Sequence, residues 1–247
     1  MAGTALRRRL TWQLATVEGL VDETPRVRTI VLDVPDWSGH RAGQHLDVRL
    51  TAEDGYRAER EYSIASAPGE QVAITVERLE DGEVSPYLTE ELIAGDAFEV
   101  RGPLGGYFVW GAENGGPLLL VAGGSGIVPL RLILRHRDRS GSDVPVRLLY
   151  SSRSLEDVIY REELDEPKAG VDVAHTLTRA QPEGWTGHSR RVDTGLLREV
   201  AWPAANSPLA FICGPTSFVE VVADGLVELG YEPARVKTER FGATGGK

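Results

Sequence analysis

The stretch from Leu118 to Pro129 combines residue types that could hold a phosphate group. It reads as an apolar strand, then Gly123-Gly124-Ser125-Gly126, then the first turn of a helix that contains Pro129. Glycines let the backbone approach a pyrophosphate closely, and a helix N-terminus offers free N–H groups at the positive end of its dipole. The spacing differs from the G-x-G-x-x-G pattern of dinucleotide-binding dehydrogenases, so a tight turn without a ligand is the alternative interpretation.

A second candidate is the run Arg60-Glu61-Tyr62-Ser63, which lies in a predicted strand. Period-two geometry places Arg60 and Tyr62 on one face, and it places Glu61 and Ser63 on the other. An arginine and a tyrosine on one face suit a phosphate joined to a flat ring. The alternative is a surface strand with a salt bridge and a half-buried tyrosine.

A third candidate is the turn Gly82-Glu83-Val84-Ser85, which is followed by Pro86 and a helical pattern. Ser85 is a good N-cap residue, and proline is favoured at the first helical position. The start of such a helix could hold a second phosphate. The alternative is an ordinary capped helix.

The sequence pattern of the first half of the chain predicts strands, which would position the second and third candidate motifs. Apolar residues recur with period two from about Trp12 to Pro103, with Gly, Asp and Pro turns between the runs. Short strands at this spacing are typical of an antiparallel sandwich or barrel. The clearest runs are 27–32, 45–50, 71–76 and 97–100, and one helix is expected over residues 85–93.

From about Pro117 onward, buried strands alternate with segments of helical period. This alternation predicts βαβ units on a parallel sheet. The sequence therefore indicates two domains, an antiparallel β-barrel over residues 1–112 and a doubly wound α/β domain over residues 113–247, with a glycine-rich linker at 111–117. The expected strands are 118–121, 146–150, 171–174 and 209–213, and the expected helices are 127–137, 155–164, 194–200 and 218–229.

Composition narrows the classes of function. The 247 residues include 27 Lys and Arg against 37 Asp and Glu, a net charge of −10, which disfavours nucleic acid and anionic membranes as partners. The single cysteine, Cys213, cannot form an internal disulfide or supply the ligands of an iron–sulfur cluster, and no Cys/His group suggests a metal. Neither a membrane span nor a signal peptide is evident, so we expect a cytoplasmic protein, and a monomer.

Taken together, the motifs resemble one family. In order along the chain they are Arg60-x-Tyr62-Ser63, Gly82-x-Val84-Ser85, Gly102-Pro103-Leu104-Gly105, Gly123-Gly124-Ser125-Gly126-Ile127-x-Pro129, Cys213-Gly214-Pro215 and Glu239-Arg240-Phe241-Gly242. This order is similar to that of the ferredoxin–NADP⁺ reductase superfamily, over nearly the whole chain. The resemblance implies a flavin on a six-stranded barrel, a nicotinamide nucleotide on the α/β domain, and hydride transfer from the nicotinamide to the flavin.

On the barrel, the resemblance implies a set of flavin-binding residues. Arg60 is expected at the pyrophosphate, Tyr62 against the flavin and its ribityl chain, and Ser63 near N5, the atom that accepts the hydride. The resemblance favours FAD over FMN as the flavin. The other expected contacts are Glu61, the backbone of Thr75, Val76 and Glu77, and the closing turn with Gly82, Val84 and Ser85.

On the second domain, the resemblance places Gly124, Ser125 and Gly126 at the nicotinamide dinucleotide. Cys213, Gly214 and Pro215 are expected to end a strand beside the nicotinamide, where Cys213 would pack near the transferred hydride. Together with Ser63 and Cys213, Glu239 is expected among the catalytic residues. Phe241 could cover the flavin ring, although the five residues that follow it leave a core position as the alternative.

The choice between NADPH and NADH depends on charge. An acidic residue after the second strand of such a domain would favour the free ribose hydroxyls of NADH. Here the second strand ends with Ser152 and Arg153, and the third with Thr178 and Arg179. Hydroxyls beside arginines suit a ribose 2′-phosphate, so NADPH is favoured over NADH. The alternative is two solvated arginines in loops.

Three functions remain open for the electrons. The leading hypothesis is delivery to a separate redox protein, such as a ferredoxin, an oxygenase component or a metalloenzyme, because no length remains for a fused acceptor. A basic patch near Arg7–Arg9, Arg235, Lys237 and Arg240 could serve such a partner. The alternatives are a small acceptor, such as free flavin, a quinone or a ferric chelate, and a flavoprotein subunit without turnover.

Overall fold

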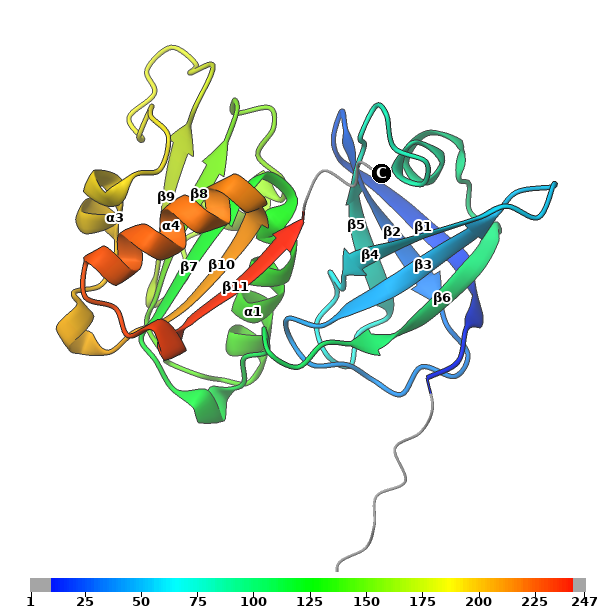
Figure 1. Ribbon diagram of the computed structural model, residues 1–247, viewed down its shortest axis with the longest axis horizontal. Helices are drawn as coiled ribbons and strands as arrows, with labels where there is room; N and C mark the ends of the chain where they lie inside the picture. Colours follow the sequence, from blue (N-terminus) through cyan, green and yellow to red (C-terminus); the bar gives the residue numbers. More distant parts are fainter. Residues whose placement is uncertain (1–9, 242–247) are drawn as a thin grey trace, which may run out of the picture.

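The computed structural model describes residues 10–241 and contains two sheets that lie side by side (Figure 1). The first sheet is antiparallel, with six strands in the order β4-β3-β6-β1-β2-β5. An isolated bridge between Ile64 and Ile74 joins the two outer strands and closes the barrel. The predicted six-stranded barrel is confirmed, with β1 at Gln13–Thr24, β2 at Val27–Asp33, β3 at His45–Thr51, β4 at Arg57–Ser63, β5 at Val72–Glu77 and β6 at Ala97–Leu104.

Alternating apolar side chains explain why these segments form barrel strands. In β2, for example, Ile30 and Leu32 are fully buried while Val31 between them is only half-buried. The long first strand was not singled out by its pattern. Its pairing with β2 slips between Val17 and Gly19, and again between Asp22 and Thr24, so its apolar period is broken twice.

The helix after β5 differs from its prediction. The structure has one π-helical turn, η1, at Tyr87–Glu91, rather than a capped helix over residues 85–93. Ser85 does not cap it, because the Ser85 hydroxyl accepts a hydrogen bond of 3.0 Å from the backbone N–H of Leu79. The serine therefore holds the preceding turn together instead of satisfying the helix N-terminus.

The second sheet is parallel, with five strands in the order β11-β10-β7-β8-β9. Two separate apolar cores cover its faces. Leu118 and Leu120 of β7 pack with α1, whereas Leu119 and Val121 pack with α3 and α4 on the other face (Figure 1). The strands are β7 at Leu118–Gly123, β8 at Val146–Ser152, β9 at Val171–Leu177, β10 at Leu209–Pro215 and β11 at Val236–Phe241, and the helices are α1 at Ile127–Arg139, α2 at Arg161–Asp165, α3 at Thr194–Val200 and α4 at Thr216–Glu228.

The predicted α/β architecture is thus confirmed, but the helix expected over residues 155–164 is much shorter. Its first half forms turns, in which the Asp157 carboxylate accepts hydrogen bonds from the backbone N–H and the hydroxyl of Ser154, at 3.0 and 2.6 Å. Tyr160 then adopts a left-handed conformation, with φ 58°, immediately before α2 begins. None of the helices within residues 10–241 is long and apolar enough to cross a membrane.

The two sheets share one core. A single cluster of buried side chains runs from the barrel through Phe108 and Trp110 into the α1 side of the second sheet. The rings of Phe108 and Phe211 meet edge to face, with centroids 5.1 Å apart. The expected division after residue 112 falls between the two sheets, in the stretch 105–117, and stays a prediction.

Candidate functional site

The second and third sequence motifs meet at one side of the barrel. The Arg60 guanidinium on β4 forms an ion pair of 2.7 Å with Glu83, which lies in the turn that contains Gly82 and Ser85. Glu83 also accepts a hydrogen bond of 2.9 Å from the hydroxyl of Tyr56. No sequence motif assigns a role to Glu83, yet its carboxylate binds Arg60 and joins the two motifs.

Strand register orients the side chains of β4. Tyr62 pairs with Leu46 and Arg60 pairs with Val48, so Arg60 and Tyr62 share one face, as the alternation predicts. Burial raises the pKa of Tyr62, so its hydroxyl keeps its proton at neutral pH. Ser63, also half-buried, ends the strand.

The barrel strand β5 lies against the glycine turn of the second domain. Thr75 and Val76 are buried and Glu77 is half-buried. An added Cβ at Gly124 would come within 3.8 Å of a carboxylate oxygen of Glu77, so the two segments approach across the boundary between the sheets. Gly82 and Val84 lie beyond the end of the same strand, and Val84 is buried.

In the glycine turn itself, η3 at Gly124–Gly126, two glycines are required for different reasons. A Cβ at Gly126 would sit 2.1 Å from the carbonyl oxygen of Cys213, so this glycine lets the turn pack on the end of β10. Gly124 has φ +55°, a conformation that L-residues rarely adopt. Packing thus explains Gly126, while Gly124 and Ser125 are only partly buried at the start of the 13-residue helix α1, where an anion would be favoured.

The ends of β10 and β11 bring an acid to the same region. Cys213 pairs with Glu239, and Pro215 pairs with Phe241. Burial, with a smaller effect of the Glu61 charge, raises the pKa of Glu239 to about 7. Since Glu61 belongs to β4, the barrel motif and the C-terminal motif converge here. Burial and the neighbouring Glu239 hold the pKa of the Cys213 thiol well above its ordinary value, so Cys213 is a packed thiol rather than a thiolate.

Beyond this acid pair, the remaining members of the motifs lie at the strand ends. Gly214 is buried against the Phe218 ring, where an added Cβ would come within 2.7 Å. Pro215 is exposed and precedes α4. Phe241 is 37% exposed at the end of β11, whereas Gly242 lies outside the described residues. The exposed ring of Phe241 is inconsistent with the core position that the sequence left as an alternative.

The loops after β8 and β9 are joined by their backbones. The Arg179 N–H donates to the Arg153 carbonyl at 2.8 Å, and both the N–H and the hydroxyl of Thr178 donate to the Ser152 carbonyl, at 3.0 and 3.1 Å. The Ser152 hydroxyl is buried and has no hydrogen-bond partner among the described residues. The Arg153 and Arg179 side chains are exposed, and within residues 10–241 neither has a carboxylate within ion-pair distance. Two cations are therefore displayed together at the carboxyl edge of the sheet.

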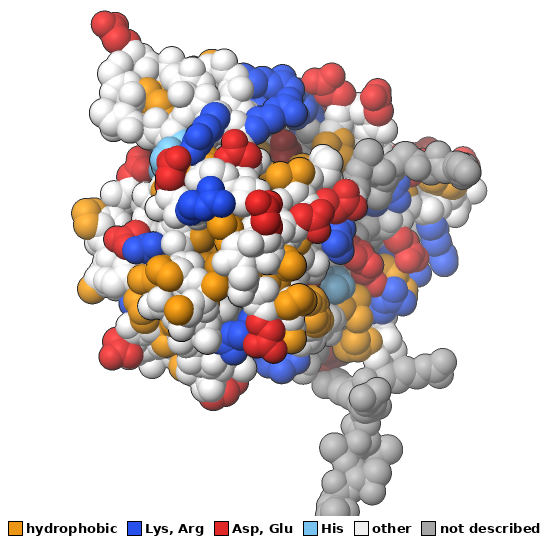
Figure 2. Space-filling model, turned by 60° about the vertical axis from the view of Figure 1, so that its left-hand side comes forward, with side chains coloured by type: hydrophobic (Ala, Val, Ile, Leu, Met, Phe, Trp, Pro, Cys, Tyr) orange, Lys and Arg blue, Asp and Glu red, His pale blue; other side chains and the backbone are white. Residues whose placement is uncertain are grey.

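Only three members of the expected basic patch, Arg235, Lys237 and Arg240, lie within the described residues. Arg235 donates to the carbonyl of Pro208 at 3.3 Å, and Lys237 donates to the carbonyl of Val109 at 3.3 Å. Arg235 therefore joins two segments of the second domain, and Lys237 joins β11 to the stretch between the two sheets. Arg240 is exposed, and Arg7–Arg9 lie outside the described residues. Figure 2 shows acidic and basic side chains interspersed over the face of the second domain that is turned forward.

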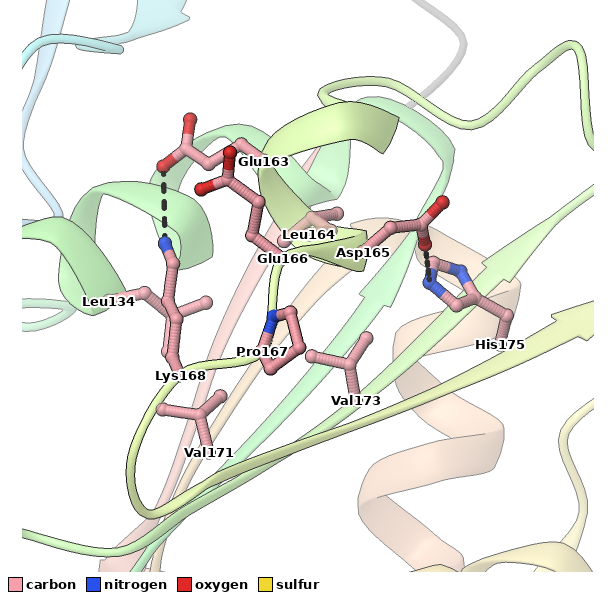
Figure 3. Close-up of a pocket in the computed structure, with 10 residues that line it drawn as sticks. All are labelled: Leu134, Glu163, Leu164, Asp165, Glu166, Pro167, Lys168, Val171, Val173 and His175. Atoms are coloured by element: carbon pink, nitrogen blue, oxygen red, sulfur yellow. Dashed lines mark ion pairs between the residues drawn. The ribbon is translucent and has the colours of Figure 1, made fainter.

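A cavity of about 250 Å³ lies elsewhere, between α1, α2 and the edge strand β9 (Figure 3). Lys168 and Glu163 approach to 3.6 Å on one side of it, and His175 and Asp165 approach to 3.7 Å on the other. None of the residues that the sequence assigned to the site lines this cavity. The candidate site is instead the junction of β4, β5, η3 and the ends of β10 and β11.

The residues at this junction fit a flavin and a nicotinamide nucleotide. The donor set on the barrel is a guanidinium and a half-buried phenol on one face of β4, followed by a hydroxyl at the end of the strand. This set suits a diphosphate attached to a flat ring system. The second domain adds the Gly124–Ser125 turn, the unpartnered Ser152 hydroxyl and the two exposed arginines. Arg60, Tyr62 and Ser63 would hold the flavin, and the second set would hold the nucleotide.

Comparisons with known proteins agree with this arrangement. The family model of the oxidoreductase FAD-binding domain matches residues 16–109, and that of the oxidoreductase NAD-binding domain matches residues 120–224. Ferredoxin–NADP reductase B of Sorangium cellulosum is 34% identical over 230 residues, which cover 88% of this chain and 93% of the relative. The glycine betaine monooxygenase reductase subunit of Chromohalobacter salexigens is 30% identical over 91% of this chain, but the chain spans only 63% of that relative's length.

Among solved structures, the FAD/NAD-binding domain of nitric oxide dioxygenase from Vibrio cholerae superposes with a TM-score of 0.82 at 25% identity, and covers 93% of this chain and 98% of the other. The class is thus that of two-domain oxidoreductases with an FAD-binding barrel and a nicotinamide-nucleotide-binding α/β domain. This chain belongs to the ferredoxin–NADP reductase superfamily.

Proposed function

We propose that this protein is an FAD-dependent reductase that oxidises NADPH and passes the electrons to a separate redox protein. The observation that carries the proposal is the junction itself, where β5 of the barrel lies against η3 of the second domain and Glu77 lies beside Gly124. The charge of Glu61 on the barrel also contributes to the raised pKa of Glu239 on the second domain. A barrel surface suited to a flavin and a strand edge suited to a nucleotide therefore meet in one place. When bound, the flavin supplies the exchange between a two-electron donor and a one-electron acceptor.

On the flavin side, Arg60 would bind the pyrophosphate, and its ion pair with Glu83 would hold the guanidinium in place. Tyr62 keeps its proton and can pack against the ring and its sugar chain. The Ser63 hydroxyl would orient the reacting edge of the flavin. FAD rather than FMN is proposed because both the domain model and the arginine favour it.

On the acid side, Glu239 has a pKa of about 7, so its carboxyl group can hold or release a proton near neutral pH. Cys213 stays a protonated thiol in this environment. Its role is to fill the space beside the nicotinamide position and to support the strand end, with no covalent step.

The preference for NADPH rests on Arg153 and Arg179. Their loops are held together by the hydrogen bond from the Arg179 N–H to the Arg153 carbonyl, so both guanidinium groups can reach one ligand. Neither group is neutralised within the described residues. A ribose 2′-phosphate would supply the missing anion, whereas NADH would leave both charges without a partner.

The separate acceptor is proposed by analogy with the relatives. The Chromohalobacter salexigens relative is named as the reductase subunit of a monooxygenase, and the Sorangium cellulosum relative as a ferredoxin reductase. This chain has only one cysteine, which is buried, so these residues do not supply the thiolates of an iron–sulfur cluster.

The test is anaerobic mixing of the purified yellow protein with NADPH or NADH in a stopped-flow spectrometer. Fast bleaching with NADPH and slow bleaching with NADH support the proposal. No bleaching with either nucleotide, despite bound flavin, contradicts it. The variant Ser63→Ala should keep the flavin and bleach more slowly, and reduction at the wild-type rate would remove the role given to Ser63.

The acceptor is tested in a second assay, because bleaching reports only the first half of the reaction. NADPH oxidation is followed with ferredoxins or oxygenase components added, and compared with the rate in oxygen alone. A saturable increase supports a protein acceptor. Saturation instead by micromolar free flavin, quinone or ferric chelate would assign a small acceptor.

A further inference from the structure

Tyr160 occupies a backbone conformation that a bulky residue rarely adopts. Its φ is 58°, and the only other described non-glycine residue with positive φ is Ser207. Tyr160 follows the connection after β8 and directly precedes α2. Such a conformation persists only where the surroundings hold it, and it is common where position matters for function.

Contacts from both sheets hold the Tyr160 ring. The side chain is buried, at 5% exposure, and the Arg131 guanidinium of α1 lies 3.9 Å from the ring centroid. Arg131 also donates to Glu163 of α2 at 2.6 Å and to the Ala65 carbonyl of the barrel at 3.4 Å. Arg131 therefore packs on the ring and contacts the barrel, at the boundary between the two domains.

The Tyr160 hydroxyl continues into the barrel through a chain of hydrogen bonds. It donates to the Thr75 hydroxyl of β5 at 2.5 Å. The Thr75 and Thr29 hydroxyls are 2.7 Å apart, and Thr29 donates to the Glu23 carboxylate at 2.6 Å. A carboxylate only accepts, so every donor in the chain points the same way, with Tyr160 as the first. Burial raises the pKa of Tyr160 to about 12, so this donor is present throughout the neutral range.

The strand that Tyr160 grips also borders the glycine turn. Thr75 and Glu77 are two residues apart on β5, and they therefore lie on the same face. Glu77 is the residue that approaches Gly124, at the start of α1. The hydrogen bond from Tyr160 therefore ties the strand that would carry the flavin to the domain whose turn would carry the nucleotide.

We infer that Tyr160 is a positioning residue for the transfer between nicotinamide and flavin, acting through its hydrogen bond to Thr75. The inference rests on the proposed function. Loss of the hydroxyl alone should let β5 shift relative to η3 while both binding surfaces stay intact. The limiting rate of flavin reduction should then fall, because transfer depends steeply on the placement of the reacting atoms, and the affinity for the nucleotide should stay the same.

The experiment compares Tyr160→Phe and Thr75→Val, which remove the two ends of the bond, with the double variant. The matched control is Tyr231→Phe, because the buried Tyr231 hydroxyl also donates one hydrogen bond, of 2.6 Å to the Trp202 carbonyl, but packs in the other core of the second domain. Flavin content, the limiting rate of bleaching by NADPH and the apparent dissociation constant are measured for each holoprotein.

The expected result is a limiting rate about tenfold lower in Tyr160→Phe, or about 1.4 kcal/mol in the barrier, with flavin content and dissociation constant unchanged. The double variant should be no slower than the slower single variant, because Tyr160→Phe breaks only the bond to Thr75, and Thr75→Val already breaks that bond together with the one to Thr29. A wild-type rate in Tyr160→Phe, an equal loss in Tyr231→Phe, or multiplied losses in the double variant would overturn the inference.

A second readout needs no turnover, and so separates this inference from the proposed function. Hydrogen–deuterium exchange of the segment Val72–Glu77 should be faster in Tyr160→Phe than in the wild type, and unchanged in Tyr231→Phe. If the wild-type flavin is not bleached by either nucleotide, the proposed function fails, and the role in transfer fails with it. If the wild-type flavin is bleached by NADPH but exchange in Tyr160→Phe is unchanged, the proposed function stands and the inference about Tyr160 fails, because its hydroxyl does not hold β5.

Discussion

The protonation of Glu239 should leave a measurable mark on the stability of the protein. Its pKa is about 7 in the folded state, against 4.5 for a free carboxyl group, mainly because the side chain is buried and secondarily because Glu61 faces it. Between these two pH values the folded state binds the proton more tightly than the unfolded state. The free energy of unfolding should therefore fall as pH rises from 4.5 to 7. Above pH 7 the carboxylate is charged in both states, and the full destabilisation by the buried charge is present.

The size of the effect follows from the same two values. At about 1.4 kcal/mol per pH unit, the limit is about 3 kcal/mol, and we expect about 2 kcal/mol because the half-buried side chain keeps some contact with solvent. The variant Glu239→Gln resembles the protonated carboxyl group and cannot ionise. It should match the wild type near pH 5 and be the more stable protein near pH 8, by about 2 kcal/mol.

The assay is urea unfolding of the two flavoproteins at several pH values between 5 and 8, in which the difference between them cancels the titration of the other groups. Glu61→Gln removes the secondary cause, so it should move the pH dependence slightly toward lower pH without abolishing it. A difference between wild type and Glu239→Gln that is constant from pH 5 to 8 would refute the assignment of a raised pKa to Glu239.

Three further predictions concern the binding surfaces and the turn between them. Arg60→Ala should weaken flavin binding by about tenfold to a hundredfold, because a charged contact is lost. Glu83→Gln removes only the ion-pair partner of Arg60, so it should weaken flavin binding less. Flavin titration of the two apoproteins measures both affinities. Arg153→Ala combined with Arg179→Ala should raise KM for NADPH by about tenfold or more and leave KM for NADH nearly unchanged in steady-state kinetics, whereas equal increases would mean that the arginines do not contact a 2′-phosphate. Gly126→Ala should lower the free energy of unfolding by about 3 kcal/mol in urea denaturation, because its Cβ would meet the rigid Cys213 carbonyl at 2.1 Å. In the same assay Gly124→Ala should lower it by only about 1 kcal/mol, because its Cβ would make an ordinary contact with Glu77 and only the positive φ is unfavourable.

Much of the fold was accessible from local patterns. Local patterns predict four of the five strands of the second domain to within a few residues, because a parallel strand buried on both faces is a continuous apolar run. They miss the edge strand β11, in which only Val236 is buried. The helix Thr194–Val200 was predicted with its bounds, and Asp193 caps it by accepting from the Leu196 N–H at 2.7 Å. The first barrel strand, β1, escaped because its two register shifts break the period.

The sequence pattern predicts a helix over residues 155–164, but in the structure the connection after β8 forms turns and α2 begins only at Arg161. Residues 155–164 carry a helical period, but the local turn between Ser154 and Asp157 and the tertiary contact of Tyr160 override it. A hydrogen bond from Tyr160 to Thr75, across 85 positions of sequence, leaves no local signal. The effect of the Glu61 charge on the pKa of Glu239 is equally invisible in the sequence, although the types and order of the motif residues identify each of them as a candidate.

The core shared by the two sheets limits how this enzyme can be rebuilt. Phe108 and Trp110 precede residue 112, yet they pack in the same cluster as Phe211 of β10, and the Tyr107 hydroxyl reaches the Val236 carbonyl at 3.3 Å. A chimera joined at residue 112 would press these aromatic rings against a foreign sheet. Exchanging nucleotide preference by transplanting a whole α/β module should therefore disrupt folding, whereas replacing the exposed arginines one by one leaves the junction untouched. A substitution in this shared core of one domain therefore has to be accommodated by the aromatic rings of the other domain.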